Sequence, residues 1–205
     1  MENLKRAKIA VFVSGGGTNL QALLDAEKNG IIKSGTISLV ISNSPSAYAL
    51  ERAKNFNVES LVITKKETGS QDAFEEAIKE ELKKRGIDLI VLAGFMSILS
   101  EDFTKEFNRR IINVHPSLIP SFCGKGYYGL KVHEEALKKG VKVTGATVHF
   151  VNEIPDGGEI IMQKAVDVLE GDTPEILQKR VMQEAEWILL PLSVEQVSRK
   201  IFSEK

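Results

Sequence analysis

The stretch Arg110-Ile-Ile-Asn-Val-His-Pro-Ser-Leu-Ile-Pro120 places polar side chains in what otherwise reads as an interior strand. Residues 111–114 have the apolar, β-branched composition of a buried strand, and Asn113 interrupts them. Residues two apart on a strand share a face, so Asn113 and His115 are expected to point the same way. Pro116 cannot donate to a sheet ladder, so the strand must end and feed a loop. Because ligands bind at the carboxyl ends of strands in open α/β sheets, this is the first candidate site.

The composition of the whole chain limits the classes of function. Its 205 residues are 42% hydrophobic and 27% charged, which predicts one soluble globular domain over residues 1–205. The net charge of −1, with both signs interspersed, favours small-molecule partners over nucleic acid or a membrane surface. The single cysteine, Cys123, allows no intrachain disulfide and predicts a reducing, cytoplasmic location. The longest uncharged apolar run, residues 89–96, is far too short to span a membrane.

Strands and helices alternate along the chain. We expect strands at residues 8–13, 37–41, 59–63, 88–93, 111–114, 144–151 and 160–168. Helices are expected up to residue 28, at 47–54, 71–85 and 130–139, from about 100, and from 174 onward. The terminal helix is expected to kink at Pro191 and to bury a stripe made of Leu177, Val181, Ala185, Ile188 and Leu192. This alternation predicts an α/β fold with a doubly wound, mostly parallel sheet and an antiparallel strand pair in its C-terminal part.

A glycine-rich loop, Ser14-Gly-Gly-Gly-Thr-Asn19, lies between the first strand and the first helix. Backbone N–H groups and the helix dipole favour an anion such as phosphate at this position. The loop lacks the lysine of a Walker A motif, and it lacks the third glycine and the later acid of a dinucleotide fingerprint. A monophosphate therefore suits it better than a dinucleotide, and the alternative is a tight turn that binds nothing.

Asp156 lies in a Pro-Asp-Gly-Gly turn, and such turns are common without any function. If strand 144–151 lies beside the strand of His115, however, Asp156 emerges at the same sheet edge and can reach the imidazole. A carboxylate there should raise the pKa of His115 above its ordinary value. Asparagine, histidine and aspartate at one point suit acyl-type transfer, with two donors for an oxyanion and a third group that sets protonation. Taken singly, Asn113 also fits a turn cap and His115 a hydrogen-bonded buried histidine.

The other histidines carry less weight. We expect His133 to lie on an exposed helix face in contact with water, and His149 to be part of the core or of a pocket lining. Three histidines and one cysteine without close spacing predict no metal site. Nothing beside Cys123 in the sequence indicates an activated thiol.

Four segments, residues 14–21, 92–99, 112–120 and 147–158, closely resemble the phosphoribosylglycinamide formyltransferase family, in the family's order and over nearly the whole chain. The resemblance implies a Rossmann-like formyltransferase fold and an enzyme of de novo purine biosynthesis. Such an enzyme transfers the formyl group of 10-formyltetrahydrofolate, its cosubstrate, to the amine of glycinamide ribonucleotide. It needs no metal and works as a monomer or homodimer. The alternatives are a formyltetrahydrofolate hydrolase, with water as the acceptor, and a non-catalytic nucleotide-binding module.

The resemblance also implies residue roles. The catalytic residues are Asn113, His115 and Asp156. The ribonucleotide is bound by Gly17, Thr18, Asn19, Gln183 and Glu186, although a different count along the last helix gives Glu184 instead of Glu186. The folate is bound by Met96, Ser97, Ile98, Leu99, Asn113, Asn152, Glu153, Ile154, Pro155 and Asp156. Ser97 stands where many relatives have arginine, and Gln71 lies near a position that is often basic.

Overall fold

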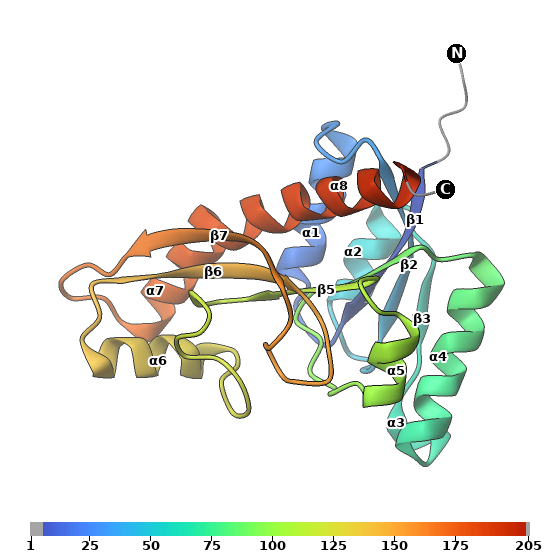
Figure 1. Ribbon diagram of the computed structural model, residues 1–205, viewed down its shortest axis with the longest axis horizontal. Helices are drawn as coiled ribbons and strands as arrows, with labels where there is room; N and C mark the ends of the chain where they lie inside the picture. Colours follow the sequence, from blue (N-terminus) through green and yellow to red (C-terminus); the bar gives the residue numbers. More distant parts are fainter. Residues whose placement is uncertain (1–5, 204–205) are drawn as a thin grey trace.

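The computed structural model of the protein describes residues 6–203, so residues 1–5 and 204–205 of the expected domain lie outside the described residues. Within residues 6–203, seven strands form one sheet in the order β3-β2-β1-β4-β5-β6-β7 (Figure 1). The strands are β1 (Ala7–Val13), β2 (Gly35–Ser42), β3 (Ser60–Val62), β4 (Leu89–Leu92), β5 (Ile111–His115), β6 (Val143–Phe150) and β7 (Ile160–Asp167). Neighbours from β3 to β5 are parallel, and β6 pairs antiparallel with both β5 and β7. The predicted fold class is confirmed.

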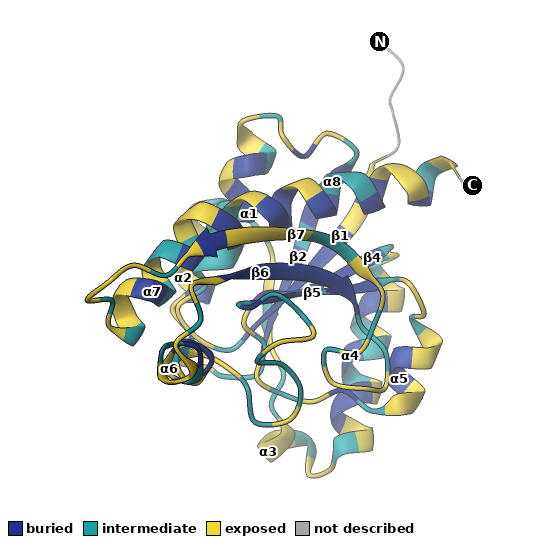
Figure 2. Cartoon of the chain, turned by 60° about the vertical axis from the view of Figure 1, so that its left-hand side comes forward, coloured by how far each residue is buried: buried dark blue, intermediate teal, exposed yellow. Residues whose placement is uncertain are grey.

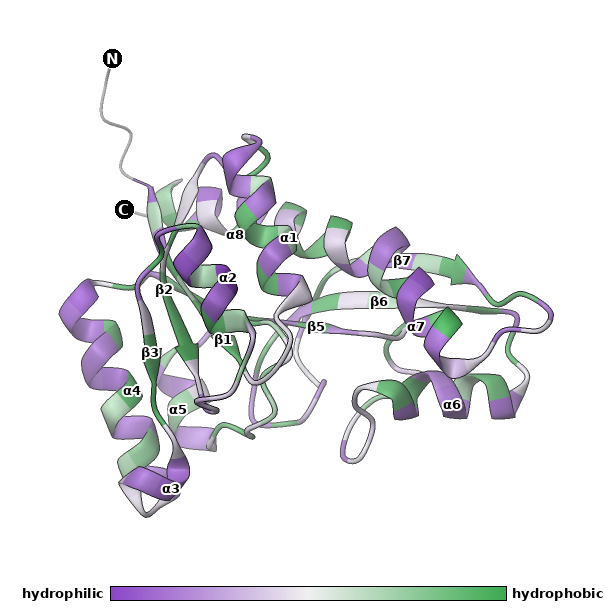
Figure 3. Cartoon of the chain, turned by 180° about the vertical axis from the view of Figure 1, so that it is seen from behind, coloured by the Kyte–Doolittle hydropathy of each residue, from purple (hydrophilic) through white to green (hydrophobic). Residues whose placement is uncertain are grey.

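Helices cover both faces of the sheet (Figures 1 and 3). They are α1 (Thr18–Lys28), α2 (Ala49–Asn55), α3 (Lys65–Thr68), α4 (Gln71–Arg85), α5 (Glu101–Glu106), α6 (Leu130–Lys139), α7 (Pro174–Val181) and α8 (Trp187–Ser203). Along β1, Ile9 and Val11 join the core beneath α1 and α8, whereas Ala10 and Phe12 join the core beneath α4 and α5. The central strands are therefore apolar on both faces, as expected for a parallel sheet covered on each side, and they are buried (Figure 2).

The helix predicted at residues 71–85 is confirmed to the residue as α4. Ser70 caps its first turn by accepting a hydrogen bond from the Ala73 N–H, and Gly86 ends it with a φ of +64°. Phe74 is buried on its inner face, as predicted. The one-turn helix α3 was not predicted, because four residues are too few to show a helical period.

The predicted stripe of the terminal helix is correct only in its first half. Leu177, Val181 and Ala185 are buried, but Ile188 and Leu192 are 41% and 42% exposed. Between α7 and α8 the chain forms one π-helical segment, η1 (Met182–Glu186), and α8 continues through Pro191. A π turn holds one residue more than the α-helical pattern, so every position after it is rotated around the helix axis.

His133 is also not where the sequence pattern predicted. It is completely buried on the inner face of α6, between Val132 and Ala136, and α6 packs against α7. The prediction failed because an isolated charged helix does not reveal which of its faces a distant segment will cover. Burial lowers the pKa of His133 to about 4, and the nearby charge of His115 acts in the same direction.

Candidate functional site

The side chains predicted to act together meet at the carboxyl end of β5. The antiparallel register places His115 opposite Thr147 and Asn113 opposite His149. The condition on which the role of Asp156 depended, that β6 lies beside β5, is therefore met. The turn that leaves β6 carries Asp156 to the same edge of the sheet, where its carboxylate lies between two imidazoles. Two segments distant in sequence, residues 113–115 and 149–156, thus contribute to one cluster of polar groups.

His115 is 4% exposed, and both of its ring nitrogens face oxygen atoms. Its Nε2 donates a hydrogen bond to the Phe122 carbonyl at 2.8 Å, and its Nδ1 lies 3.4 Å from Asp156 Oδ2. Burial lowers the pKa of His115 below its ordinary value, although Asp156 and the Phe122 carbonyl both act to raise it. The expectation of a raised pKa is therefore wrong, because the loss of hydration outweighs the attraction of the carboxylate.

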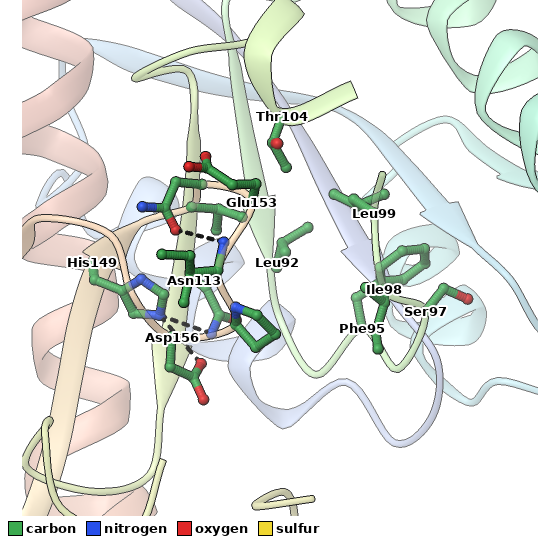
Figure 4. Close-up of a pocket in the computed structure, with 14 residues that line it drawn as sticks. Leu92, Phe95, Ser97, Ile98, Leu99, Thr104, Asn113, His149, Glu153 and Asp156 are labelled. Atoms are coloured by element: carbon green, nitrogen blue, oxygen red, sulfur yellow. Dashed lines mark hydrogen bonds and ion pairs between the residues drawn. The ribbon is translucent and has the colours of Figure 1, made fainter. Parts of the chain in front are cut away.

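His149 and Asn113 orient one another across the two strands. His149 Nδ1 donates to the Phe150 carbonyl at 2.8 Å, so Nε2 is an acceptor whenever the ring carries a single hydrogen. This Nε2 lies 3.2 Å from Asn113 Nδ2 (Figure 4). The amide nitrogen of Asn113 has two N–H groups, so the second can donate to a bound molecule. His149 is 1% exposed and lines the pocket described below, as predicted.

Asp156 occupies a constrained turn, with a φ of +57° that residues other than glycine rarely adopt. Its Oδ2 accepts a hydrogen bond from the Gly124 N–H at 2.8 Å, and its Oδ1 lies 3.6 Å from His149 Nε2. Burial acts to raise the pKa of Asp156, but the contacts with His149, His115 and Gly124 together lower it. Gly158 permits the turn to pack closely, because a Cβ there would lie 1.7 Å from the Phe150 carbonyl oxygen. Asp156 is thus held as a carboxylate facing both histidines.

A pocket opens beside this cluster, between the segment that follows β4 and the turn that follows β6 (Figure 4). Nine of the ten predicted folate residues line it, namely Ser97, Ile98, Leu99, Asn113, Asn152, Glu153, Ile154, Pro155 and Asp156. Met96 does not line it; this residue is 56% exposed, and its N–H donates to Ser14 Oγ at 2.8 Å. Sequence reasoning missed four other lining residues, Leu92, Phe95, Thr104 and Val151. Strand alternation could have predicted one of them, because Val151 lies two residues after His149 and so shares its face.

The glycine-rich loop leads from β1 into α1 at the same edge of the sheet, because β1 and β5 both run parallel to β4. Gly17 is the residue before α1 and has a φ of +71°, and a Cβ there would come within 2.6 Å of Ala49 Cβ. Arg52 of α2 also contacts the loop, because its Nε donates a hydrogen bond to the Gly16 carbonyl at 2.8 Å. The N–H groups of a first helical turn have no partner within the helix, so those of Thr18 and Asn19 are available to an anion.

The π-helical segment η1 brings Glu186 to this loop. Glu186 is 6% exposed, and its Oε2 accepts a hydrogen bond from Asn19 Nδ2 at 2.8 Å. Burial raises the pKa of Glu186, which the hydrogen bond from Asn19 only partly offsets. Glu184 and Gln183 are exposed on the same segment. The structure therefore brings Glu186 to the predicted ribonucleotide residues, and it does not bring Glu184 or Gln183 into the same buried contact.

Two further observations concern metals and membranes. In residues 6–203, no group of three or more His, Cys, Asp or Glu side chains is arranged to hold a metal ion. No helix in that part of the chain is long and apolar enough to cross a membrane.

Cys123 is half-buried in the loop after β5, and burial together with the charge of Asp156 raises the pKa of its thiol. A raised pKa disfavours the reactive thiolate.

Comparison with known proteins agrees with this geometry. The family model described as formyl transferase matches residues 7–193. The chain is 39% identical to the chloroplastic phosphoribosylglycinamide formyltransferase of Arabidopsis thaliana, over 88% of this chain and 62% of that protein. It is 41% identical to the phosphoribosylglycinamide formyltransferase of Haemophilus influenzae, over 91% of this chain and 85% of that one. The chain spans less than two thirds of the plant protein and a smaller share still of longer trifunctional relatives.

Solved structures give the same result. The crystal structure of glycinamide ribonucleotide transformylase 1 from Symbiobacterium toebii superimposes with a TM-score of 0.88 at 42% identity, covering 95% of this chain and 89% of that one. Sequence identity and fold thus agree over nearly all of residues 7–193. The chain belongs to the formyl transferase family, within its group of phosphoribosylglycinamide formyltransferases.

Proposed function

We propose that the protein transfers the formyl group of 10-formyltetrahydrofolate to the amine of glycinamide ribonucleotide, giving formylglycinamide ribonucleotide and tetrahydrofolate. The observation that carries the proposal is the cluster of Asn113, His115 and Asp156 at the sheet edge that also holds the glycine-rich loop, with Asn113 and Asp156 lining the pocket. The pocket is walled largely by apolar side chains, which suits a flat folate ring system. The loop suits the phosphate of the second substrate.

The reaction needs a group that moves a proton and groups that stabilise an oxyanion. The substrate amine attacks the formyl carbon, and the carbonyl oxygen becomes negatively charged in a tetrahedral intermediate. The free N–H of Asn113 donates to this oxygen, which is where charge develops. Collapse of the intermediate breaks the bond from the formyl carbon to the folate nitrogen, which must gain the proton that the amine loses.

His115 carries that proton at Nδ1. With a lowered pKa it is neutral near pH 7, so its Nδ1 accepts the proton of the attacking amine and then donates it to the departing nitrogen. The charged imidazole exists only beside Asp156 and the oxyanion, and both favour it. This differs from a histidine that enters the reaction already protonated. Asp156 stabilises the transient charge and orients the ring.

The remaining roles belong to the same proposal. Gly17, Thr18 and Asn19 bind the ribonucleotide phosphate, and Glu186 together with Gln183 binds the ribonucleotide beside it. The nine pocket residues named above and Met96 bind the folate, and no metal takes part. The substrates are two small molecules, the active unit is a monomer or homodimer, and the single cysteine supports a cytoplasmic location.

A formyl-transfer assay tests the proposal. The purified protein is mixed with 10-formyltetrahydrofolate, with and without glycinamide ribonucleotide, and folate absorbance is followed while the ribonucleotide is analysed for the added formyl group. We expect folate turnover only when the ribonucleotide is present, with one formyl group transferred for each folate consumed. Equal turnover without the ribonucleotide would show a hydrolase, and absence of turnover would show a non-catalytic module.

A further inference from the structure

Ser117, the third residue of the His-Pro-Ser motif, is completely buried, and the roles assigned so far do not use it. Its Oγ donates a hydrogen bond to the Ser121 carbonyl at 2.5 Å, and the Ser121 N–H donates to the Leu118 carbonyl at 2.9 Å. Residues 117–121 are therefore closed into a small loop by the hydroxyl of Ser117. A buried hydroxyl that forms such a bond fixes the backbone around it.

Side chains of β6 and β7 form hydrogen bonds with the same loop. Thr147, also completely buried, donates from Oγ1 to the Ser117 carbonyl at 2.7 Å and accepts from the Ile119 N–H at 3.1 Å. Gln163 of β7 donates to Thr147 Oγ1 at 2.9 Å and to the Ile119 carbonyl at 3.0 Å. The loop after His115 is thus tied to β6 and β7 at several points.

Phe122, the residue that follows this loop, contacts His115. Phe122 places its carbonyl oxygen 2.8 Å from His115 Nε2. It does so with a φ of +49°, a conformation that a side chain other than glycine keeps only when its surroundings hold it. The bond from Ser117 to the adjacent Ser121 carbonyl supplies that restraint.

The contact with Phe122 decides which nitrogen of His115 carries the hydrogen. Both oxygen atoms that face the ring only accept, so the two contacts compete for the one hydrogen of the neutral ring. The Nε2 contact with the Phe122 carbonyl has hydrogen-bond length at 2.8 Å, whereas Nδ1 lies 3.4 Å from Asp156 Oδ2, so the hydrogen lies on Nε2 and the lone pair on Nδ1. Nδ1 is the nitrogen that faces Asp156. The other tautomer would place two lone pairs against each other at Nε2 and the carbonyl. The Phe122 carbonyl therefore keeps Nδ1 free to accept a proton from the site.

We propose that Ser117 is a positioning residue, which closes the 117–121 loop so that the Phe122 carbonyl fixes the Nε2–H tautomer of His115. The proposal rests on the proposed function, because it gives Nδ1 the proton-carrying role. Ser117 itself touches no reacting atom. Its effect reaches the reaction through the backbone of residues 121 and 122 and through the ring orientation of His115.

The test measures the tautomer directly, by nitrogen NMR of the histidine rings at pH 8, where His115 is neutral. The His115 signals are assigned by their absence in His115→Ala. In the unaltered protein we expect Nε2 to show the shift of a protonated nitrogen and Nδ1 that of an unprotonated one. In Ser117→Ala both shifts should move toward the average of the two tautomers. A protonated Nδ1 in the unaltered protein would overturn the proposal, whatever the variants do.

Kinetics provide the second measurement, with Ser193→Ala as the matched control, because Ser193 is an equally buried serine on α8. We expect Ser117→Ala to lower kcat about tenfold with little change in either KM, since a mispositioned catalytic group slows the chemical step. Thr147→Val, which breaks the loop's other anchor, should shift the tautomer in the same direction. Ser193→Ala should leave kcat and the ring signals unchanged.

The outcomes separate this proposal from the function. If Ser117→Ala and Thr147→Val both keep the tautomer of the unaltered protein, Ser117 is a packing residue and the proposal fails. If the unaltered protein transfers no formyl group but shows the Nε2–H tautomer that Ser117→Ala loses, the function fails while the positioning stands. Thermal melting of each variant shows whether a loss of kcat follows from unfolding instead.

Discussion

The buried imidazole of His133 should make the protein lose stability in mild acid. His133 is completely buried, and neither ring nitrogen has a protein hydrogen-bond partner among residues 6–203. Its pKa of about 4 in the folded protein lies below the value of about 6.5 expected in the unfolded chain. The unfolded chain therefore binds a proton between these two pH values and the folded protein does not. Stability contributed by the neutral ring is complete above pH 6.5 and falls as the pH falls toward 4.

The magnitude follows from the two pKa values. One pKa unit corresponds to about 1.4 kcal/mol, so the full loss below pH 4 is about 3 kcal/mol, of which about 2 kcal/mol is lost by pH 5. Such an amount is a large fraction of the about 5–15 kcal/mol by which most proteins are stable. His133→Leu removes the titrating group while it keeps an apolar side chain in the site.

The assay is urea unfolding of the unaltered protein and His133→Leu at several pH values between 7.5 and 5. Carboxylates and the other histidines titrate in both proteins, so their contributions cancel in the difference. We expect His133→Leu to gain about 2 kcal/mol relative to the unaltered protein over this range. It should also be no less stable at pH 7.5, since it leaves no buried ring nitrogen unsatisfied. A difference that does not change with pH would refute the buried, neutral state of His133.

Three predictions concern the proposed site. His115→Ala should lower kcat by at least about 10²-fold while folate binding, followed by fluorescence, is retained, and near-normal turnover would contradict its role. Asp156→Asn should lower the pKa of His115 further, because the carboxylate is one of the groups that raise it, and kcat near neutral pH should fall. NMR titration of the His115 ring measures this, and an unchanged or higher pKa would show that the two residues are not coupled. The dephosphorylated ribonucleoside should have a much lower kcat/KM than the ribonucleotide, whereas equal values would mean that the glycine-rich loop binds no phosphate.

The parts of the fold that the sequence predicted are those set by local patterns. The ends of α4 follow from a serine cap and a glycine stop, and both signals lie within the segment itself. The pairing of β6 with β7 follows from the turn at residues 155–158, which brings the chain back beside β6. Asn113 and His115 share a face because strands have a period of two, which no distant contact can change. Position along the strand therefore predicted that Asn113 and His115 lie together in the candidate site.

Features that depend on distant segments were harder to predict. The pKa of His115 follows from how deeply the loop at residues 117–124 covers it, and no local pattern encodes that depth. The burial of His133 depends on α7, about forty residues later in the chain. A weak signal existed, since His133 lies three residues before Ala136 and so shares its helix face. Met96 does not line the pocket, and its backbone contact with the distant Ser14 could not be read from a local pattern, so its contact with folate stays a prediction.

The terminal helix shows how one local irregularity can serve both packing and function. After the π turn, the buried positions are Leu189 and Ser193 in place of the expected Ile188 and Leu192, a displacement of one residue. One residue corresponds to about 100° around an α-helix, which is enough to turn a buried position into an exposed one. The same turn ends at Glu186, whose carboxylate is buried against Asn19 of the glycine-rich loop. Burying a carboxylate is unfavourable for stability, so its position here is better explained by the ligand that we propose for the loop than by packing.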